Sequence, residues 1–336
     1  MKNKILIINN GFASKHIPLI INSFIDANGD NVKVIHNHLK DYYSFLQKVF
    51  YKLRFPIDFN NFNSRIINAI NSFSPNLIII IKGNDVYPRT LREIRLINSK
   101  SKIISWTSDN MLKPHNSSSH FIKSIPMYDI HFTTKSTIVD DFYKNGAKKV
   151  VFLNKAYSRG SHYPDYNQKL KFEVLFIGTY ELSRYTSLKY LADNGIEVNI
   201  FGNDWQKINS KKKLIIHKKS LEGSSYRQAI SSSKITLCFL RKSNDDLQTC
   251  RSVEIPACKG FMIAERTIEH QNLFKENEEA IYFESNEELL DKVKLYLNDD
   301  IQRELIAKRG YERAIKSDYS YGNMINIIMK SSLYKK

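Results

Sequence analysis

Short apolar runs alternate with amphipathic helical segments along most of the chain. In the first half, these runs lie at residues 5–8, 32–35, 77–81, 103–106 and 130–133. Continuous runs rich in β-branched residues are typical of strands buried on both faces of a parallel sheet. The segments between them have helical spacing, as in 62–73, where Ile66, Ile67 and Ile70 are placed to face inward. The alternation predicts βαβ units in a doubly wound sheet.

The alternation pauses at residues 156–170, where AYSRGSHYPDYNQK lacks apolar periodicity and predicts a linker. A second series of runs follows at residues 174–177, 198–201, 214–216, 235–240, 261–264 and 281–283. We therefore expect two tandem Rossmann-like α/β domains, at 1–155 and 171–312, with an interdomain cleft. Ligands of such folds bind at the carboxyl ends of the strands.

The first loop of the second domain, FIGTYELSR, has features of an anion site. Gly178 and Thr179 follow the predicted strand, and Gly178 allows close backbone approach. A helix N-terminus follows, which favours an anion, and Arg184 in its first turn opposes the helix dipole unless a diphosphate binds there. A plain β–α turn is the structural alternative.

The next strand ends in the sequence IFGNDW. Gly202, Asn203 and Asp204 follow it, and polar side chains at this end of a strand are expected to face the cleft. A structural turn explains the same residues equally well.

The segment from Gln248 to Cys258 is predicted to be a helix that Pro256 bends or shortens. Arg251 and Glu254 are three residues apart and share one face of it. The carboxylate is suited to ribose hydroxyl groups and the guanidinium to phosphate oxygens. A surface ion pair, which contributes under about 1 kcal/mol, is the alternative.

The charge of the chain is strongly positive and unevenly distributed. Lys and Arg number 51 against 34 Asp and Glu, for a net charge of +17. Residues 1–155 hold 22 basic and 10 acidic side chains, a net of +12, whereas 156–336 hold 29 and 24, a net of +5. This asymmetry indicates a first domain that meets an anionic membrane surface, nucleic acid or a phosphorylated acceptor. A lysine-rich solubilising surface is the alternative, since the lysines are scattered.

The residues that usually bind metals or form disulfides are sparse. Cys238, Cys250 and Cys258 form no Cys-x-x-Cys pair, and Asp245 and Asp246 are a bare acidic pair, so neither a disulfide framework nor a metal site is expected. No stretch approaches the roughly 20 apolar residues of a membrane span, and the first apolar run is too short for a signal peptide. We expect a cytoplasmic protein, with peripheral contact at the inner face of the membrane as a further option.

The segment RSVEIPACKGFMIAERTIE from Arg251 to Glu269, together with FIGTYELSRY and FGNDW, resembles the CgeB-like glycosyltransferases. That family is named for a spore-maturation protein and is part of the broader group-1 glycosyltransferases. KGNDVYPRTLREIR, IISWTSDN, LNKAYSRGSHYP and ELIAKRGYERAIKSDYSY are similar to further family segments, so the resemblance covers most of the chain. It implies a GT-B fold whose second domain binds a nucleotide sugar and whose first domain binds the acceptor. It also implies a C-terminal helix, within 313–336, that packs back on the first domain.

The resemblance also assigns roles to individual residues. Glu254 matches the ribose-binding glutamate of the family, and Ser252 lies in the same R-S-x-E element. Asp246 precedes Glu254 by eight residues, in the acid-x7-acid spacing that retaining members fill with two glutamates, so inversion and retention both stay open. Arg184 and Arg251 are candidates to stabilise the leaving diphosphate. The expected donor is a UDP-sugar, and no cofactor is expected.

An inverting transferase needs a base that deprotonates the acceptor hydroxyl. Asp109 and Asn110 follow the run at 103–106, and Asp109 is the first candidate. Phage DNA glucosyltransferases have a similar arrangement, in which a strand is followed by Thr-x-Asp. A turn or helix cap at Asp109 and Asn110 is the structural alternative to a catalytic role. His16, in the first loop GFASKH, is the second candidate, because histidine there is the base of some other inverting GT-B enzymes. Gly11 provides close backbone approach in the same loop.

Three functions are consistent with the sequence. The first is a glycosyltransferase in surface polysaccharide, lipid-linked glycan or glycoprotein synthesis. The second is a DNA-modifying glycosyltransferase, which the basic first domain favours although no aromatic and basic groove is legible. The third is a non-catalytic module that binds a nucleotide or a sugar.

Overall fold

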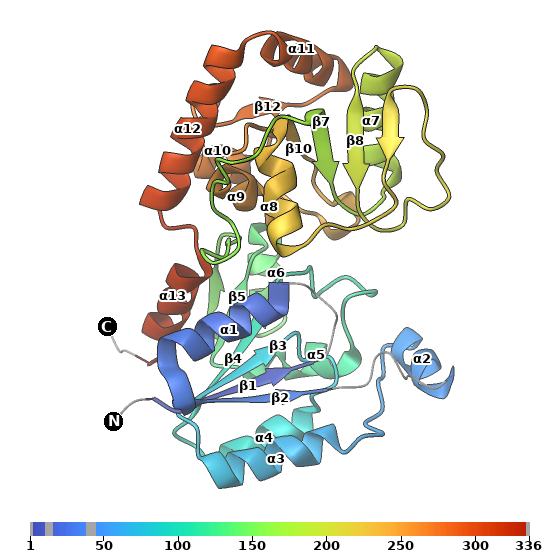
Figure 1. The fold of residues 1–336 in the computed structure, drawn as a ribbon. Helices are drawn as coiled ribbons and strands as arrows, with labels where there is room; N and C mark the ends of the chain where they lie inside the picture. Colours follow the sequence, from blue (N-terminus) through green and yellow to red (C-terminus); the bar gives the residue numbers. More distant parts are fainter. Residues whose placement is uncertain (1–2, 11–15, 38–44, 334–336) are drawn as a thin grey trace. The chain divides into compact units, whose positions relative to one another are not determined.

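The computed structural model describes residues 3–10, 16–37 and 45–333. The chain divides into two compact units (Figure 1). Unit 1 comprises Met1–Asn154 and Tyr321–Lys336, and unit 2 comprises Lys155–Ser320. Each unit has one parallel six-stranded sheet with helices against it. The prediction of two tandem Rossmann-like α/β folds is therefore confirmed.

The sheet of unit 1 has the strand order β2-β1-β3-β4-β5-β6. Its strands are β1 (Ile5–Asn9), β2 (Val32–His36), β3 (Leu77–Ile81), β4 (Lys102–Thr107), β5 (Ile130–Thr133) and β6 (Val150–Phe152). Its helices are α1 (His16–Asn28), α2 (Phe45–Lys52), α3 (Phe62–Phe73), α4 (Pro88–Ile97), α5 (Ser119–Ser124), α6 (Val139–Lys144) and α13 (Tyr321–Leu333). The edge strand β6 was not predicted, although Val150, Val151 and Phe152 are all apolar.

Helices cover both faces of this sheet. On one face, Leu6 and Ile8 of β1 pack against α3 and α4, with Ile66 and Leu91 in the same apolar cluster. On the other face, α13 contacts both α1 and β4. α12 of unit 2 ends at Lys316, and α13, which lies within the expected range 313–336, begins at Tyr321.

The sheet of unit 2 has the strand order β12-β11-β10-β7-β8-β9. Its strands are β7 (Phe172–Ile177), β8 (Val198–Phe201), β9 (Leu214–Ile216), β10 (Ser233–Cys238), β11 (Met262–Glu265) and β12 (Ile281–Phe283). Its helices are α7 (Leu182–Asp193), α8 (Gly223–Ser231), α9 (Arg251–Ala257), α10 (Ile268–Leu273), α11 (Asn286–Leu297) and α12 (Asp300–Lys316). All six predicted runs of this half form strands.

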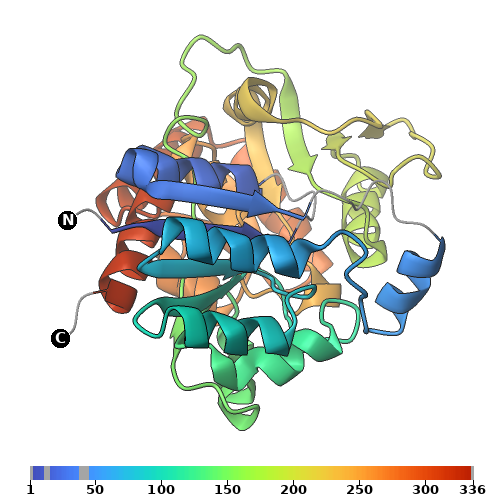
Figure 2. The ribbon, with the colours of Figure 1, turned by 90° about the horizontal axis from the view of Figure 1, so that it is seen from below.

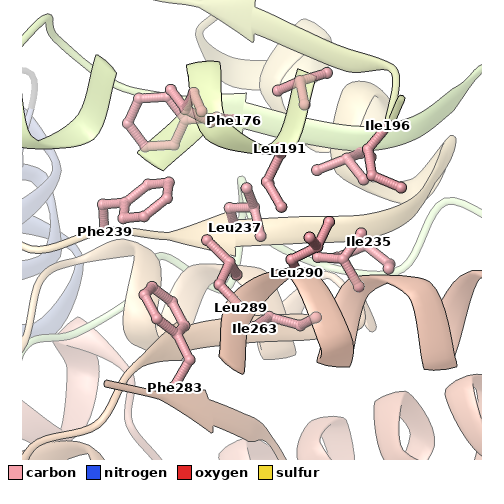
Figure 3. Close-up of a cluster of buried hydrophobic side chains, with 14 of the residues drawn as sticks. Phe176, Leu191, Ile196, Ile235, Leu237, Phe239, Ile263, Phe283, Leu289 and Leu290 are labelled. Atoms are coloured by element: carbon pink, nitrogen blue, oxygen red, sulfur yellow. The ribbon is translucent and has the colours of Figure 1, made fainter. Parts of the chain in front are cut away.

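The larger core of unit 2 lies between one face of this sheet and the helices α7 and α11 (Figure 3). Phe176, Leu237 and Ile263 come from three neighbouring strands, and Leu191 and Leu289 meet them from α7 and α11. The opposite face packs against α8, α9 and α10. Since both faces are covered, the strands are apolar almost throughout.

Residues 156–170 were predicted to be a linker, but they make defined contacts with the rest of unit 2. Tyr157 is 1% exposed, and its backbone pairs with Ser320 in an isolated bridge. The Arg227 guanidinium lies 3.9 Å from the centre of the Tyr163 ring. Aromatic side chains therefore fix this segment although it has no apolar periodicity.

Arg266 joins β11 to the elements that follow it. Its NH2 group donates to Glu276 Oε1 at 2.6 Å and to Glu288 Oε1 at 2.7 Å, and NH1 lies 3.3 Å from Glu284 Oε1. Hydrogen bonds from Arg266 are the largest cause that lowers the pKa of both Glu276 and Glu288. One half-buried guanidinium thus ties together the loop after β11 and the start of α11.

We predict that Arg266→Met destabilises unit 2 by about 2 kcal/mol at neutral pH, the range for charged hydrogen bonds. Carboxylates with lowered folded-state pKa values stabilise the fold above their unfolded value of about 4.3, and this stability is lost as the pH falls through the folded value. The difference between variant and wild type in urea unfolding should therefore be constant above about pH 5 and shrink as the pH falls below about 4.3. Arg309→Met, at an exposed position of α12, is the control, and a pH-independent difference would contradict the assignment.

Candidate functional site

The sheet of unit 2 reverses its strand order between β7 and β10, which lie side by side although β8 and β9 come between them in sequence. Such a reversal is where open α/β sheets bind ligands, beyond the carboxyl ends of the strands. β7 leads here into Gly178 and Thr179, and β10 leads into Phe239 and Leu240. The candidate donor-site residues are distributed around this point.

Arg184 joins the two loops at the reversal. Its side chain is 4% exposed, and its Nε and NH2 groups donate to the Leu240 carbonyl at 3.0 and 2.9 Å. NH1 donates to the Thr179 carbonyl at 2.8 Å. Burial, followed by the charge of Arg251, lowers the pKa of Arg184 to about 10, while Glu181 opposes the shift. Arg184 therefore keeps its charge at neutral pH while it holds both loops in place.

Arg251, the first residue of α9, lies beside Arg184. The two guanidinium carbons are each 5.9 Å from the centre of the Phe176 ring. Arg251 NH2 donates to the Phe239 carbonyl at 3.2 Å. Glu181 lies 3.7 Å from Arg184 Nε, whereas no carboxylate of the described residues lies within salt-bridge distance of Arg251. Two neighbouring cations with one nearby carboxylate favour an anionic ligand.

Gly178 and Gly202 are needed for the packing of the two loops. A Cβ on Gly202, which has φ +148°, would lie 2.0 Å from the Gly178 carbonyl oxygen. The Trp205 indole donates to the same oxygen at 2.8 Å, and a Cβ on Gly178 would lie 2.6 Å from the Phe176 ring. The close approach that the sequence predicted at Gly178 is thus made by protein atoms. Thr179, Asn203 and Asp204 are exposed around it.

Glu254 is buried in α9, where sequence reasoning did not foresee its partners. The Tyr226 hydroxyl donates to Glu254 Oε2 at 2.9 Å, and His162 Nε2 lies 3.7 Å from Oε1. Burial, with the negative charge of Glu254, raises the pKa of Tyr226 well above its ordinary value, so the hydroxyl stays a donor. Tyr226 lies in α8 and His162 in the expected linker, and neither position carried a local signal.

Ser252 is fully buried and supports the start of α9 from inside. Its hydroxyl accepts from the Thr249 amide at 2.9 Å and lies 2.7 Å from His270 Nε2. His270 Nδ1 lies 2.6 Å from the Glu265 carbonyl, and burial lowers the pKa of the imidazole. A neutral imidazole that donates a hydrogen bond from Nδ1 accepts one from the Ser252 hydroxyl at Nε2. With 0% of Ser252 exposed, this pair holds the helix in position.

Asp246 lies in the turn between β10 and α9. Its Oδ1 accepts from the Asn244 side chain at 3.0 Å, and its amide donates to the Arg241 carbonyl at 3.2 Å. Asp245 before it has φ +49°, which turns the chain sharply. Asp246 is partly exposed on the rim of the reversal.

Asp109 in unit 1 follows β4 and pairs with Lys82, which follows β3. Lys82 Nζ lies 2.6 Å from Asp109 Oδ2, and both side chains are about one-fifth exposed or less. Lys82 has φ +65°, a left-handed conformation that is costly for a residue with a Cβ. The two residues therefore form one charged pair across neighbouring strand ends.

The other candidate residues of unit 1 lie close to structural partners. Asn110 Oδ1 accepts from the Leu112 amide at 3.1 Å, which is the Asx-type turn that local sequence allowed. His16 begins α1, and its Nδ1 lies 3.3 Å from the hydroxyl of Tyr321, the first residue of α13. Gly11 lies outside the described residues.

Comparisons with known proteins bear on the second half of the chain most directly. Residues 184–330 match the family model described as glycosyl transferase-like. This range contains Arg184, Arg251 and Glu254. No curated protein sequence matches the chain.

The whole chain is similar in fold to solved structures. Anabaena HepE, crystallised with UDP and glucose, has a TM-score of 0.69 at 10% identity, over 98% of this chain and 100% of that chain. TarM has a TM-score of 0.68 at 9% identity, over 98% of each chain. Sucrose-phosphate synthase from Thermosynechococcus elongatus has a TM-score of 0.66 at 11% identity, over 97% of this chain and 98% of that chain. The fold is GT-B.

The chain is therefore similar to glycosyltransferases in the sequence of residues 184–330 and in its fold. Its glycosyl transferase-like match begins at Arg184, the residue that fixes the two loops at the sheet reversal. None of the described helices is long and apolar enough to cross a membrane.

We predict that Tyr226→Phe destabilises the protein by about 1–3 kcal/mol, because the buried carboxylate of Glu254 would lose a hydrogen-bond donor. Thermal unfolding should show a drop of several degrees. Tyr190→Phe on α7, a partly exposed tyrosine, is the matched control. Equal melting temperatures for the two variants would mean that the Tyr226 hydroxyl does not support Glu254.

Proposed function

We propose that the protein moves a sugar from a UDP-sugar to an acceptor hydroxyl. The observation that carries the proposal is the pair of neighbouring arginines, Arg184 and Arg251, at the strand reversal of unit 2. A diphosphate is negatively charged and would neutralise the two guanidinium groups. The UDP and UDP-glucose in the HepE crystal structures support the choice of nucleotide.

In the proposed donor complex, Arg251 contacts the diphosphate. Arg184 holds the loops after β7 and β10 in place through the Thr179 and Leu240 carbonyls. Glu254 accepts hydrogen bonds from the ribose hydroxyls, with its side chain held by Tyr226. Thr179, Asn203, Asp204 and Asp246 are exposed or partly exposed and form the polar rim, whereas the buried Ser252, Gly178 and Gly202 shape the backbone. This assigns the donor to unit 2 without a metal ion or a cofactor.

Unit 1 is proposed to bind the acceptor. Asp109 is the proposed base if the reaction inverts the anomeric centre, with Lys82 fixing its carboxylate. His16 is the second candidate, and Gly11 and Asn110 belong to the same acceptor side. A retaining route needs no dedicated enzyme base, and the Asp246 to Glu254 spacing resembles that of retaining members.

The acceptor class we favour is a glycan, lipid-linked glycan or glycoprotein of a surface polysaccharide pathway, as the CgeB-like resemblance implies. The basic first half of the chain supports a peripheral position on an anionic membrane. A DNA acceptor is less well supported, since the solved structures of similar fold include HepE with glucose, a sucrose-phosphate synthase, and TarM with fondaparinux and α-GlcNAc-glycerol. A non-catalytic module is less well supported, because the family model that matches residues 184–330 is glycosyl transferase-like.

We predict that Arg251→Gln weakens UDP binding by about tenfold to a hundredfold but leaves uridine binding unchanged, since the guanidinium meets only the diphosphate. Calorimetry with UDP, UMP and uridine separates the two contributions. Arg184→Gln should instead lower the melting temperature of the ligand-free protein, because the Thr179 and Leu240 carbonyls lose their donors. Equal losses for uridine and UDP with Arg251→Gln would place the diphosphate elsewhere.

We predict that Asp109→Asn lowers turnover by about 10²–10⁴, the usual contribution of a general base, with UDP affinity unchanged. Release of UDP in the presence of acceptor gives turnover, and calorimetry gives affinity. His16→Ala should have the smaller effect. The reverse order would assign the base to His16, and near-normal turnover in both variants would favour a retaining route.

A further inference from the structure

The densest run of exposed apolar side chains in the described residues lies in and after α2. Phe45 is 80% exposed, Leu46 60% and Leu53 65%. Phe55, Ile57 and Phe59 are 46%, 43% and 49% exposed. We call these six residues the α2 patch. Exposed apolar clusters of this kind mark surfaces that meet a partner or a membrane.

The sequence of α2 explains part of this exposure. Phe45 and Val49, and likewise Leu46 and Phe50, are four residues apart and form one apolar stripe along the helix. An apolar stripe is normally buried against the core. Here Val49 and Phe50 are only partly covered, and in both views α2 stands away from the sheet of unit 1 (Figures 1 and 2).

The segment is nevertheless fixed to unit 1. The Tyr51 hydroxyl donates to Asp85 Oδ2 at 3.2 Å, just after β3. Arg54 NH2 donates to the Ser117 hydroxyl at 2.9 Å, and the Arg54 carbonyl accepts from the Ser119 amide at 2.7 Å. These contacts anchor the chain on both sides of Leu53, so the fold itself presents the patch.

The charges beside the patch are positive. Lys123 Nζ lies 5.6 Å from the centre of the Phe55 ring, and the Arg89 guanidinium lies 5.0 Å from the centre of the Tyr87 ring. Phe55 and Tyr87 both contact the His120 ring, with centroids 4.8 and 4.5 Å apart. Lys52, Arg89 and Lys123 are all exposed.

The one carboxylate within residues 45–59 is directed inward. Asp58 Oδ1 accepts from the Phe62 amide at 2.8 Å, and Oδ2 accepts from the Asn63 amide at 2.8 Å. Burial raises the pKa of Asp58, but its hydrogen bonds outweigh this and lower the pKa overall. Asp58 thus caps the first amides of α3. The exposed charges beside the α2 patch are those of Lys52, Arg89 and Lys123.

We propose that the α2 patch docks unit 1 onto the surface of a bilayer that contains anionic lipids. Apolar side chains flanked by Lys and Arg enter the boundary between headgroups and acyl chains, while the cations meet the headgroup phosphates. The choice of a bilayer over a protein rests on charge complementarity, since Lys52, Arg89 and Lys123 border an apolar surface that exposes no carboxylate of its own. This deepens the proposed peripheral position and does not depend on sugar transfer.

Vesicle sedimentation of the full chain tests the proposal. Binding to phosphatidylcholine vesicles containing phosphatidylglycerol should exceed binding to pure phosphatidylcholine, and added salt should weaken it. Phe45→Ser/Leu46→Ser/Leu53→Ser should weaken binding at least about tenfold, since each apolar side chain contributes to insertion. The matched control is Leu96→Ser/Leu295→Ser/Ile301→Ser, at positions 86%, 55% and 79% exposed, and it should bind like wild type.

A charge variant, Lys52→Ser/Lys123→Ser, should lose about fivefold per removed cation on the anionic vesicles only, compared with Lys100→Ser/Lys149→Ser. UDP affinity is measured for every variant, so that loss of vesicle binding with intact UDP binding reports on the patch alone. Absence of wild-type binding at low salt, equal loss in the matched control, or patch-dependent dimerisation in light scattering would each overturn the proposal. Loss of UDP binding with intact vesicle binding would instead contradict the proposed donor site.

Discussion

The buried guanidinium of Arg184 is the constraint on which the arrangement of unit 2 depends. A buried cation costs several kcal/mol unless its N–H groups find acceptors. The loops after β7 and β10 supply them, through the Thr179 and Leu240 carbonyls at 2.8–3.0 Å. Because both loops must direct carbonyls at one side chain, their paths at the strand reversal are fixed together. The site is therefore organised before any ligand arrives, which lowers the entropy cost of binding.

The same constraint holds two cations close together at the strand reversal. Arg251 begins α9 and shares the Phe176 ring with Arg184, so two like charges are held near each other. Their repulsion contributes to the lowered pKa of Arg184, and Glu181 offsets it only in part. Folding thus carries an electrostatic cost at this point, and a bound diphosphate would remove it. Arg251 is the member of the pair whose side chain is less engaged with backbone carbonyls.

The sequence was sufficient for the sheets because their strands are continuous apolar runs, a signal that is local in the chain. β6 was missed although β9 and β12, which are edge strands of the same length, were predicted from runs of three apolar residues. The partners of Glu254 were missed because Tyr226 and His162 reach it from 28 and 92 positions away, so only the tertiary fold brings them together. The sequence indicated close backbone approach at Gly178, but a glycine can allow the approach of a ligand or of Gly202 and Trp205, and the sequence alone does not distinguish these.

Unit 1 has a half-buried ion pair between Lys82 and Asp109, whereas unit 2 has two neighbouring cations. Lys82 adopts φ +65°, which costs about 1 kcal/mol or more for a residue with a Cβ. Its amide still donates to the Trp106 carbonyl at 3.1 Å, so the strain does not interrupt the connection between β3 and β4. The strained backbone places the lysine amine 2.6 Å from Asp109 Oδ2. The cost is understandable if the orientation of the carboxylate is what the fold preserves. That orientation matters for a base that must face an acceptor hydroxyl, and it matters much less for a carboxylate that only caps a turn.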